Sequence, residues 1–89
     1  MISEAKPLSV DVLGFDIPIK YVTYADLQCW GVAVYEPGCV ELRIASEATG
    51  RRLASTIFHE RLELALMIVG FSGDEAAKEQ VICVAELLL

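Results

Sequence analysis

The sequence predicts an α+β fold, with extended segments first and helices after them. As far as about residue 48, apolar residues alternate with polar ones or form short β-branched and aromatic runs between turn residues. From Thr49 onward, apolar residues recur every three to four positions, which is the period of an amphipathic helix. A chain of 89 residues holds one small domain. We therefore expect a single domain over residues 1–89, with residues 1–7 as a flexible tail.

Two extended segments are expected near the N-terminus, over Leu8–Leu13 and Ile17–Tyr24, with Gly14 and Asp16 between them. Pro18 places the second segment at a strand start or a sheet edge, because proline has no N–H to donate. Residues 24–28 are expected to form a connector or a short turn.

The clearest hairpin joins Gly31–Tyr35 to Cys39–Ala45 through a turn at residues 36–38, which contain proline and glycine. In the second arm three apolar residues alternate with two charged ones, which indicates a half-exposed strand. The apolar set is Val40, Leu42 and Ile44, and the charged set is Glu41 and Arg43.

A long helix is predicted from Thr49 or Gly50 to about Gly70. Its apolar stripe consists of Leu53, Ile57, Leu64 and Ile68, with Ala54, Phe58 and Ala65 beside it. A capping signal at Ser72 followed by acidic residues predicts a second helix over roughly 74–88. Together these segments predict a small, mostly antiparallel sheet followed by two helices.

The composition narrows the classes of function. A formal net charge of −6, with no basic stripe, argues against nucleic-acid binding. The longest apolar run is too short to cross a bilayer, and no secretory signal is recognised, so we expect a cytoplasmic protein. Three widely spaced cysteines, Cys29, Cys39 and Cys83, are expected to be buried, reduced thiols. The hydrophobic fraction of 55% is high for so small a domain, which favours a homo-oligomer with a buried interface.

The chemistry of the chain is concentrated around His59, the only histidine. Glu63 follows His59 by four residues, so both side chains project from the same side of a helix and can reach a single metal ion. A third ligand must come from another element, and the second predicted helix offers four carboxylates. These are Asp74, Glu75, Glu79 and Glu86.

The strand, the arginine pair at 51–52 and the His59-Glu60 sequence together resemble the core of the small phage-associated zincins. In those metallopeptidases a hairpin precedes a helix with the motif His-Glu-x-x-His, and an acidic second helix follows. The likeness extends over about residues 17 to 88. This chain departs from the motif at its second histidine, where it has Glu63, so that the motif becomes His-Glu-x-x-Glu.

The resemblance implies a zincin-like phage or prophage peptidase that acts on a peptide or protein. It makes His59 the first ligand, Glu60 the general base and Glu79 the ligand from the second helix, with Glu75 and Glu86 as alternatives. The implied metal is Zn²⁺. Oxygen-rich ligand sets favour harder ions, so Mn²⁺ is one alternative. The other alternative is that no metal binds.

Two other interpretations stay open. His59 and Glu63 form an ordinary stabilising surface pair if Glu60, Arg61 and Glu63 are simply the solvated face of the helix. The chain would then be a non-enzymatic protein that keeps the fold and binds a protein partner or its own copy.

Overall fold

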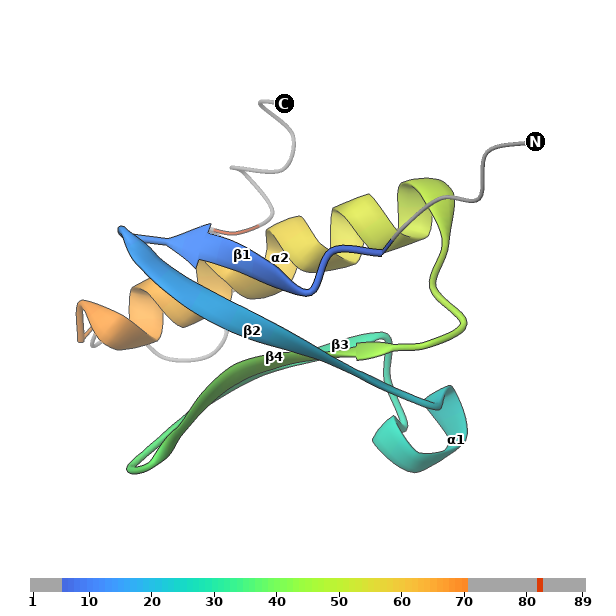
Figure 1. The fold of residues 1–89 in the computed structure, drawn as a ribbon, viewed down its shortest axis with the longest axis horizontal. Coiled ribbons are helices and arrows are strands. Elements are labelled where there is room, and N and C mark those ends of the chain that lie inside the picture. The colour runs from blue at the N-terminus through green and yellow to red at the C-terminus, as the bar shows by residue number, and fades with distance from the viewer. Residues whose placement is uncertain (1–5, 71–81, 83–89) are drawn as a thin grey trace.

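A computed structural model describes residues 6–70 and Ile82. Over these residues a four-stranded sheet carries one long helix across one face, and a short helix follows the second strand (Figure 1). The elements are β1 (Ser9–Val12), β2 (Phe15–Val22), α1 (Tyr24–Leu27), β3 (Gly31–Glu36), β4 (Cys39–Ala45) and α2 (Gly50–Ile68). The α+β class is confirmed. Apart from Ile82, the second helix predicted over 74–88 lies outside the described residues.

The strands are ordered β1-β2-β4-β3. β1 pairs with β2 and β3 pairs with β4, both antiparallel, as the two hairpin-like segments predict. β2 and β4 are parallel neighbours, with Ile19 opposite Leu42 and Tyr21 opposite Ile44. The sheet is therefore mostly antiparallel with one parallel pair at its centre. Its two outer strands are β1 and β3, and β3, next to β4, is the outer strand that contacts the site described below.

Pro18 lies within β2 rather than at a strand start, and β2 is an inner strand. The prediction of a strand start or a sheet edge is therefore wrong for this strand, but the pairing at Pro18 explains why proline fits there. β2 pairs with β1 as far as Pro18, and its pairing with β4 begins only at Ile19. Pro18 thus has a strand partner on one side alone, which is why a residue without an N–H is tolerated there.

The turn between β1 and β2 consists of Leu13 and Gly14, both with positive φ, 53° and 88°. Two consecutive left-handed residues are the geometry of a type I′ hairpin turn, whose twist matches that of the flanking strands. Gly14 adopts this conformation freely, whereas Leu13 does so at a steric cost. The extended segment predicted to start at Ile17 therefore begins two residues earlier, at Phe15.

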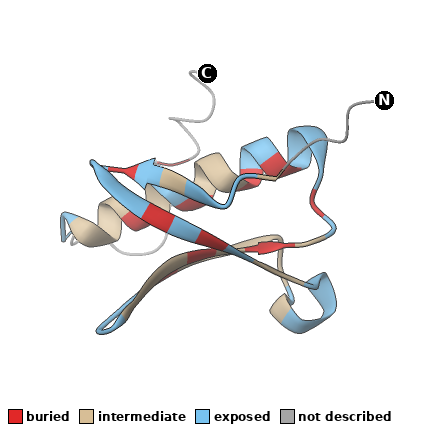
Figure 2. Ribbon diagram, viewed as in Figure 1, coloured by how far each residue is buried: buried red, intermediate tan, exposed pale blue. Residues whose placement is uncertain are grey.

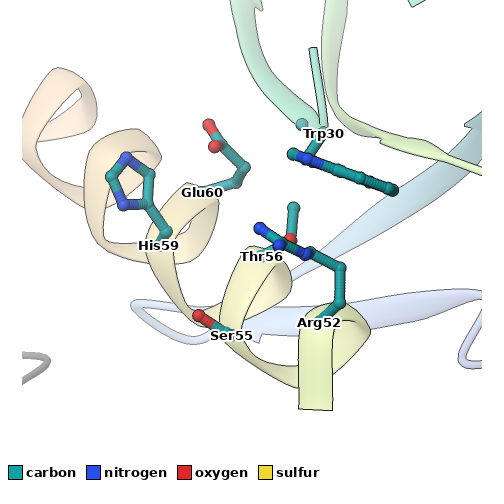
Figure 3. Close-up of a pocket in the computed structure, with 7 residues that line it drawn as sticks. Trp30, Arg52, Ser55, Thr56, His59 and Glu60 are labelled. Atoms are coloured by element: carbon teal, nitrogen blue, oxygen red, sulfur yellow. The ribbon is translucent and has the colours of Figure 1, made fainter. Parts of the chain in front are cut away.

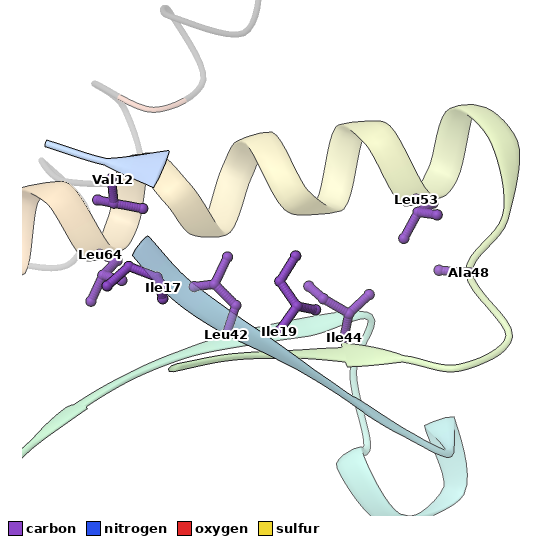
Figure 4. Packing of buried hydrophobic residues seen from close by; sticks show 8 residues of the cluster. All are labelled: Val12, Ile17, Ile19, Leu42, Ile44, Ala48, Leu53 and Leu64. Carbon is purple, nitrogen blue, oxygen red and sulfur yellow. The ribbon is translucent and has the colours of Figure 1, made fainter. Parts of the chain in front are cut away.

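The hydrophobic core fills the layer between α2 and the sheet (Figures 2 and 4). Leu42 and Ile44 of β4 point into it and are fully buried, together with Leu64 of α2. Each such side chain contributes about 1.5–3 kcal/mol through burial. The remaining buried members of the cluster are Val12, Ile17, Ile19, Ala48 and Leu53.

The predicted stripe of α2 is confirmed at Leu53 and Leu64, while Ile57 and Ile68 are half-buried against the core. Ala54, expected beside the stripe, is exposed because it faces away from the sheet. Arg61 fixes the helix to the first hairpin, since its guanidinium donates two hydrogen bonds to the carbonyl oxygen of Asp11, at 3.1 and 2.8 Å. Apolar burial and the hydrogen bonds of Arg61 therefore both attach the helix to the sheet.

Two residues expected to belong to the flexible tail contact the sheet. The hydroxyl of Tyr21 donates a hydrogen bond to the carbonyl oxygen of Pro7 at 2.6 Å. Lys6 donates to the carbonyl of Ser46 and lies 5.2 Å from the centre of the Tyr21 ring.

The cysteines among the described residues are free, as expected. Cys29 and Cys39 are half-buried rather than fully buried; Cys29 precedes β3, and Cys39 is the first residue of β4. Cys83 lies outside the described residues.

Candidate metal centre

The three candidate site residues on α2 differ in how far they are buried. Its buried residues are Leu53, Thr56, Glu60 and Leu64, spaced by three or four positions along the side that packs on the sheet. Glu60 therefore belongs to the buried face and is only 6% exposed. His59 and Glu63 flank that face and keep 28% and 22% of their side-chain surface exposed.

The three side chains converge. Nε2 of His59 lies 3.9 Å from Oε2 of Glu63, one helical turn away. One ligand atom from each of His59, Glu60 and Glu63 lies within 4.8 Å of the other two. One imidazole and two carboxylates in such a group form a donor set that suits a divalent cation.

The backbone of β3 approaches α2 most closely at Gly31. A Cβ atom at Gly31 would lie 2.6 Å from Cγ2 of Thr56 and 3.0 Å from Cγ of Glu60. Real Cβ atoms do not come as close as the first of these distances to another carbon, so only glycine fits without a shift of the neighbouring groups. Glycine at this position therefore allows Glu60 to lie directly beneath the start of the outer strand.

A cavity of about 250 Å³ opens beside this contact. Figure 3 shows His59 and Glu60 on one side of it and the indole of Trp30 on the other. Its lining residues among the described part of the chain are Trp30, Gly31, Arg52, Ser55, Thr56, His59 and Glu60. The candidate ligands therefore adjoin a space that a small group could enter.

Trp30 is held from two sides. The ring of Tyr24 packs against it at a centroid distance of 4.9 Å and a tilt of 60°, and Cζ of Arg52 lies 4.7 Å from the centre of the indole ring. Tilted aromatic pairs and stacked guanidinium groups are both favourable arrangements. One wall of the cavity is thereby fixed in position.

The segment that carries Tyr24 is anchored by a carboxylate. The backbone N–H of Tyr24 donates to Oε1 of Glu47 at 2.9 Å and to Oε2 at 3.2 Å, and the hydroxyl of Ser46 donates to the same carboxylate. The hydrogen bond from Tyr24 lowers the pKa of Glu47, and the bond from Ser46 lowers it further. Helix α1, predicted only as a connector, is thus tied to the loop that leads into α2.

The motif predicts His59, Glu60 and Glu63, and the structure brings these three together. It also shows that Glu60 is buried, so the interpretation of this segment as a solvated face is wrong for Glu60. Arg61 and Glu63 remain at least partly exposed. Glu79 and its alternatives Glu75 and Glu86, like Asp74, lie outside the described residues.

Several residues of the cavity do not belong to the motif. Arg52 precedes His59 by seven positions, or two helical turns, so helical spacing alone could have placed it on the same side. The contact between Gly31 and α2 carries no local signal in the sequence, because it depends on how the strand packs against the helix.

No helix within residues 6–70 is both long and apolar enough to cross a membrane. No family model matches the chain, and no curated protein or solved structure matches it either.

Proposed function

We propose that the chain is a zincin-like metal-dependent peptidase domain with a His-Glu-x-x-Glu motif. The observation that carries this proposal is the convergence of His59, Glu60 and Glu63 within 4.8 Å, beside a cavity and against the outer strand of a sheet. The order of hairpin and helix, which resembles the phage-associated zincins, supports it further.

The donor atoms fit a small divalent ion. Two ligands held ~2.1 Å from one zinc ion at the tetrahedral angle lie roughly 3.4 Å apart. The corresponding atoms of His59 and Glu63 are 3.9 Å apart, so a small rotation of either side chain brings them to this separation. The site requires at least one further ligand, and Glu79 is the residue that the resemblance assigns to it.

The proposed ligands set the preference among metals. If Glu63 and Glu79 both bind, their two negative charges balance a divalent cation. A neutral, oxygen-rich site binds manganese more readily relative to zinc than a site with two histidines does. We therefore propose Zn²⁺ as the ion, with Mn²⁺ as the principal alternative.

A bound divalent ion would polarise the carbonyl of a peptide and acidify a water molecule. Glu60 is the residue that would accept the proton of that water. Its buried position beneath Gly31 holds the carboxylate at the cavity wall, so that it can accept a proton and later pass it to the leaving amine.

The outer strand gives a route for the substrate. β3 pairs with β4 along one side and is the last strand of the sheet order, and it starts at Gly31 next to Glu60. An extended peptide could add, through backbone hydrogen bonds, to the side of β3 that pairs with no other described strand. The substrate class that we propose is therefore a peptide or an extended segment of a protein.

The experiment that tests the proposal combines metal content with hydrolysis. Protein purified without chelator is assayed for zinc and manganese, and then for cleavage of an unstructured protein such as casein. We expect one metal per chain, cleavage that EDTA abolishes and added metal restores, and a melting temperature that falls with EDTA. Metal-free protein whose melting is insensitive to zinc and manganese would contradict it.

A second candidate function, a non-enzymatic interaction module or homo-oligomer, is favoured by a separate observation. Phe15, Tyr35 and Val69 are large apolar residues that are half or more exposed. Phe15 and Tyr35 also line a largely apolar cavity of about 350 Å³, together with Val40 and Ile68. Exposed apolar groups around a concavity are typical of a protein-binding surface.

Light scattering tests the self-association that this candidate predicts. A stable dimer that Phe15→Asp converts to a monomer would support self-association. A monomer at high concentration, with or without the substitution, would count against it.

A further inference from the structure

The cavity beside the candidate metal centre has one permanently charged cationic side chain among its described lining residues, that of Arg52. The guanidinium is stacked on Trp30, with Cζ 4.7 Å from the ring centre, and Figure 3 shows the side chain rising from α2 to lie alongside the indole. Stacking on the ring restricts the guanidinium and directs its N–H groups to the side, the geometry in which they can donate to a ligand.

The electrostatic surroundings of Arg52 are unusual for a helix start. Residues 51 and 52 are both arginines in the first turn of α2, and that turn contains no acidic residue. Thr49, at the N-cap, makes no side-chain hydrogen bond to the helix. The N-terminus of a helix carries partial positive charge, so two cations here are mutually unfavourable unless an anion joins them. Within residues 6–70 and Ile82, the ion pairs recorded involve other residues and none includes Arg52.

We propose that Arg52 is a specificity-determining residue that recognises a carboxylate of the bound peptide. A guanidinium binds a carboxylate through two parallel N–H···O hydrogen bonds, and the fixed orientation over Trp30 reduces the entropy lost when they form. This inference rests on the proposed function, in that it places the carboxylate on a peptide in the cavity next to His59 and Glu60.

The helix geometry sets where that carboxylate lies. Arg52 and His59 are seven residues apart, which corresponds to about 10 Å along the helix axis. An extended peptide covers that distance in about three residues. The preferred peptide therefore has an acidic side chain, or its own C-terminal carboxylate, two or three residues from the bond that lies at His59 and Glu60.

Trp30 makes the proposal directly measurable, because it is the only tryptophan in the chain and its ring forms the wall that Arg52 covers. Its fluorescence can be followed while short peptides are added, in the metal-free protein and again after zinc is added. The probes are three acetylated alanine-based peptides of equal length. One carries glutamate and an amidated C-terminus, the second carries glutamine in its place, and the third carries glutamine with a free C-terminal carboxylate.

We expect the glutamate peptide to bind about tenfold more tightly than the amidated glutamine peptide, in the range of one charge-assisted hydrogen-bond pair. The third peptide shows whether a terminal carboxylate serves equally well. In Arg52→Gln the glutamate peptide and the amidated glutamine peptide should bind with about equal affinity. Arg52→Lys should retain part of the preference for glutamate, because lysine keeps the charge but lacks the planar guanidinium. Arg51→Gln is the matched control, since it removes the same charge from the adjacent residue, which does not line this cavity.

Equal affinities for the three peptides, no saturable binding at millimolar concentration, or a preference that survives Arg52→Gln would each overturn the proposal. The preference is measured without metal as well as with it. A protein that shows it but binds no zinc therefore retains the Arg52 site while contradicting the peptidase function. A protein that binds zinc but shows no preference for the glutamate peptide contradicts the role of Arg52 and leaves the proposed peptidase function standing.

Discussion

Gly31 at the start of β3 lies against Glu60 of α2 so closely that a Cβ atom on Gly31 would come within 3.0 Å of Cγ of Glu60. The contact connects the two parts of the candidate site, because β3 is the outer strand and Glu60 is the carboxylate assigned to proton transfer. It also explains how an ionisable side chain that is 6% exposed is held in one place.

Gly31→Ala should destabilise the protein by about 1–3 kcal/mol, since the added methyl group would lie 2.6 Å from Cγ2 of Thr56. Urea denaturation measures the change. Thr56→Ser removes that methyl group. Gly31→Ala should therefore destabilise the Thr56→Ser protein much less than it destabilises the wild type. A Gly31→Ala variant as stable as the wild type would show that the strand and helix are not in this contact.

Glu60→Gln separates the two roles that this residue could have. As a proton acceptor, its loss should lower hydrolysis about 10²–10⁴-fold, while zinc affinity stays close to that of the wild type. Glutamine has the same shape, so burial beneath Gly31 is preserved. Calorimetry and peptide cleavage on the same preparation measure both quantities. A fall in zinc affinity that parallels the loss of activity would instead make Glu60 a metal ligand.

Glu63→His restores the second histidine of the zincin motif. Imidazole favours zinc more than a carboxylate does, so zinc affinity should rise on the order of tenfold while manganese affinity falls. Competition between the two metals provides the measurement. If the remaining ligands do not face the site, neither affinity will change, and the assignment of His59 and Glu63 to one ion fails.

Glu47 provides a prediction on pH. Its pKa is lowered in the folded protein by the hydrogen bond from the N–H of Tyr24. A lowered pKa means that its stabilising effect is fully present above the unfolded value of about 4.3 and is lost as the pH falls through the folded value. Wild type should therefore melt higher than Glu47→Gln at pH 7, and the two should converge toward pH 3.

Glu36→Gln is the control for this comparison. Glu36 is exposed at the turn end of the β3–β4 hairpin, where it lies opposite Cys39 in the ladder, and its side chain forms no ion pair with another described residue. Its melting should follow the wild type across the whole range. A difference between wild type and Glu47→Gln that does not depend on pH would contradict the assigned cause.

The sequence predicts the elements of this fold better than their arrangement. The bounds of β4 agree with the prediction, and α2, observed over Gly50–Ile68, ends close to the expected Gly70. In both, the apolar pattern is set by one buried face. The parallel pairing of β2 with β4 could not be predicted, because strands distant in sequence pair through shared burial, here of Ile19 and Leu42, and not through a turn.

The sequence likewise predicts some features of the candidate site and not others. His59 and Glu63 are predictable because helical spacing alone brings positions four apart together. Glu60 stands seven residues after Leu53 and four before Leu64, so helical spacing places it on the buried face, although a carboxylate is not expected there. The orientation of Arg52 over Trp30 depends on a contact between α2 and the segment before β3, which no local pattern encodes. The short helix α1 has a cap at Thr23 that the sequence offers, but it ends at Gln28 with φ of 64°, a conformation that β-turn and helix propensities do not favour for glutamine.

The central claim is that His59 and Glu63 bind one divalent ion. Titration calorimetry of chelator-treated protein with zinc tests it most directly, with His59→Ala and Glu63→Ala beside the wild type and Glu36→Ala as a control for lost surface charge. The account predicts one zinc per wild-type and Glu36→Ala chain, and binding that is abolished in His59→Ala and weakened in Glu63→Ala. No binding in the wild type, or equal affinity in all four proteins, would contradict it.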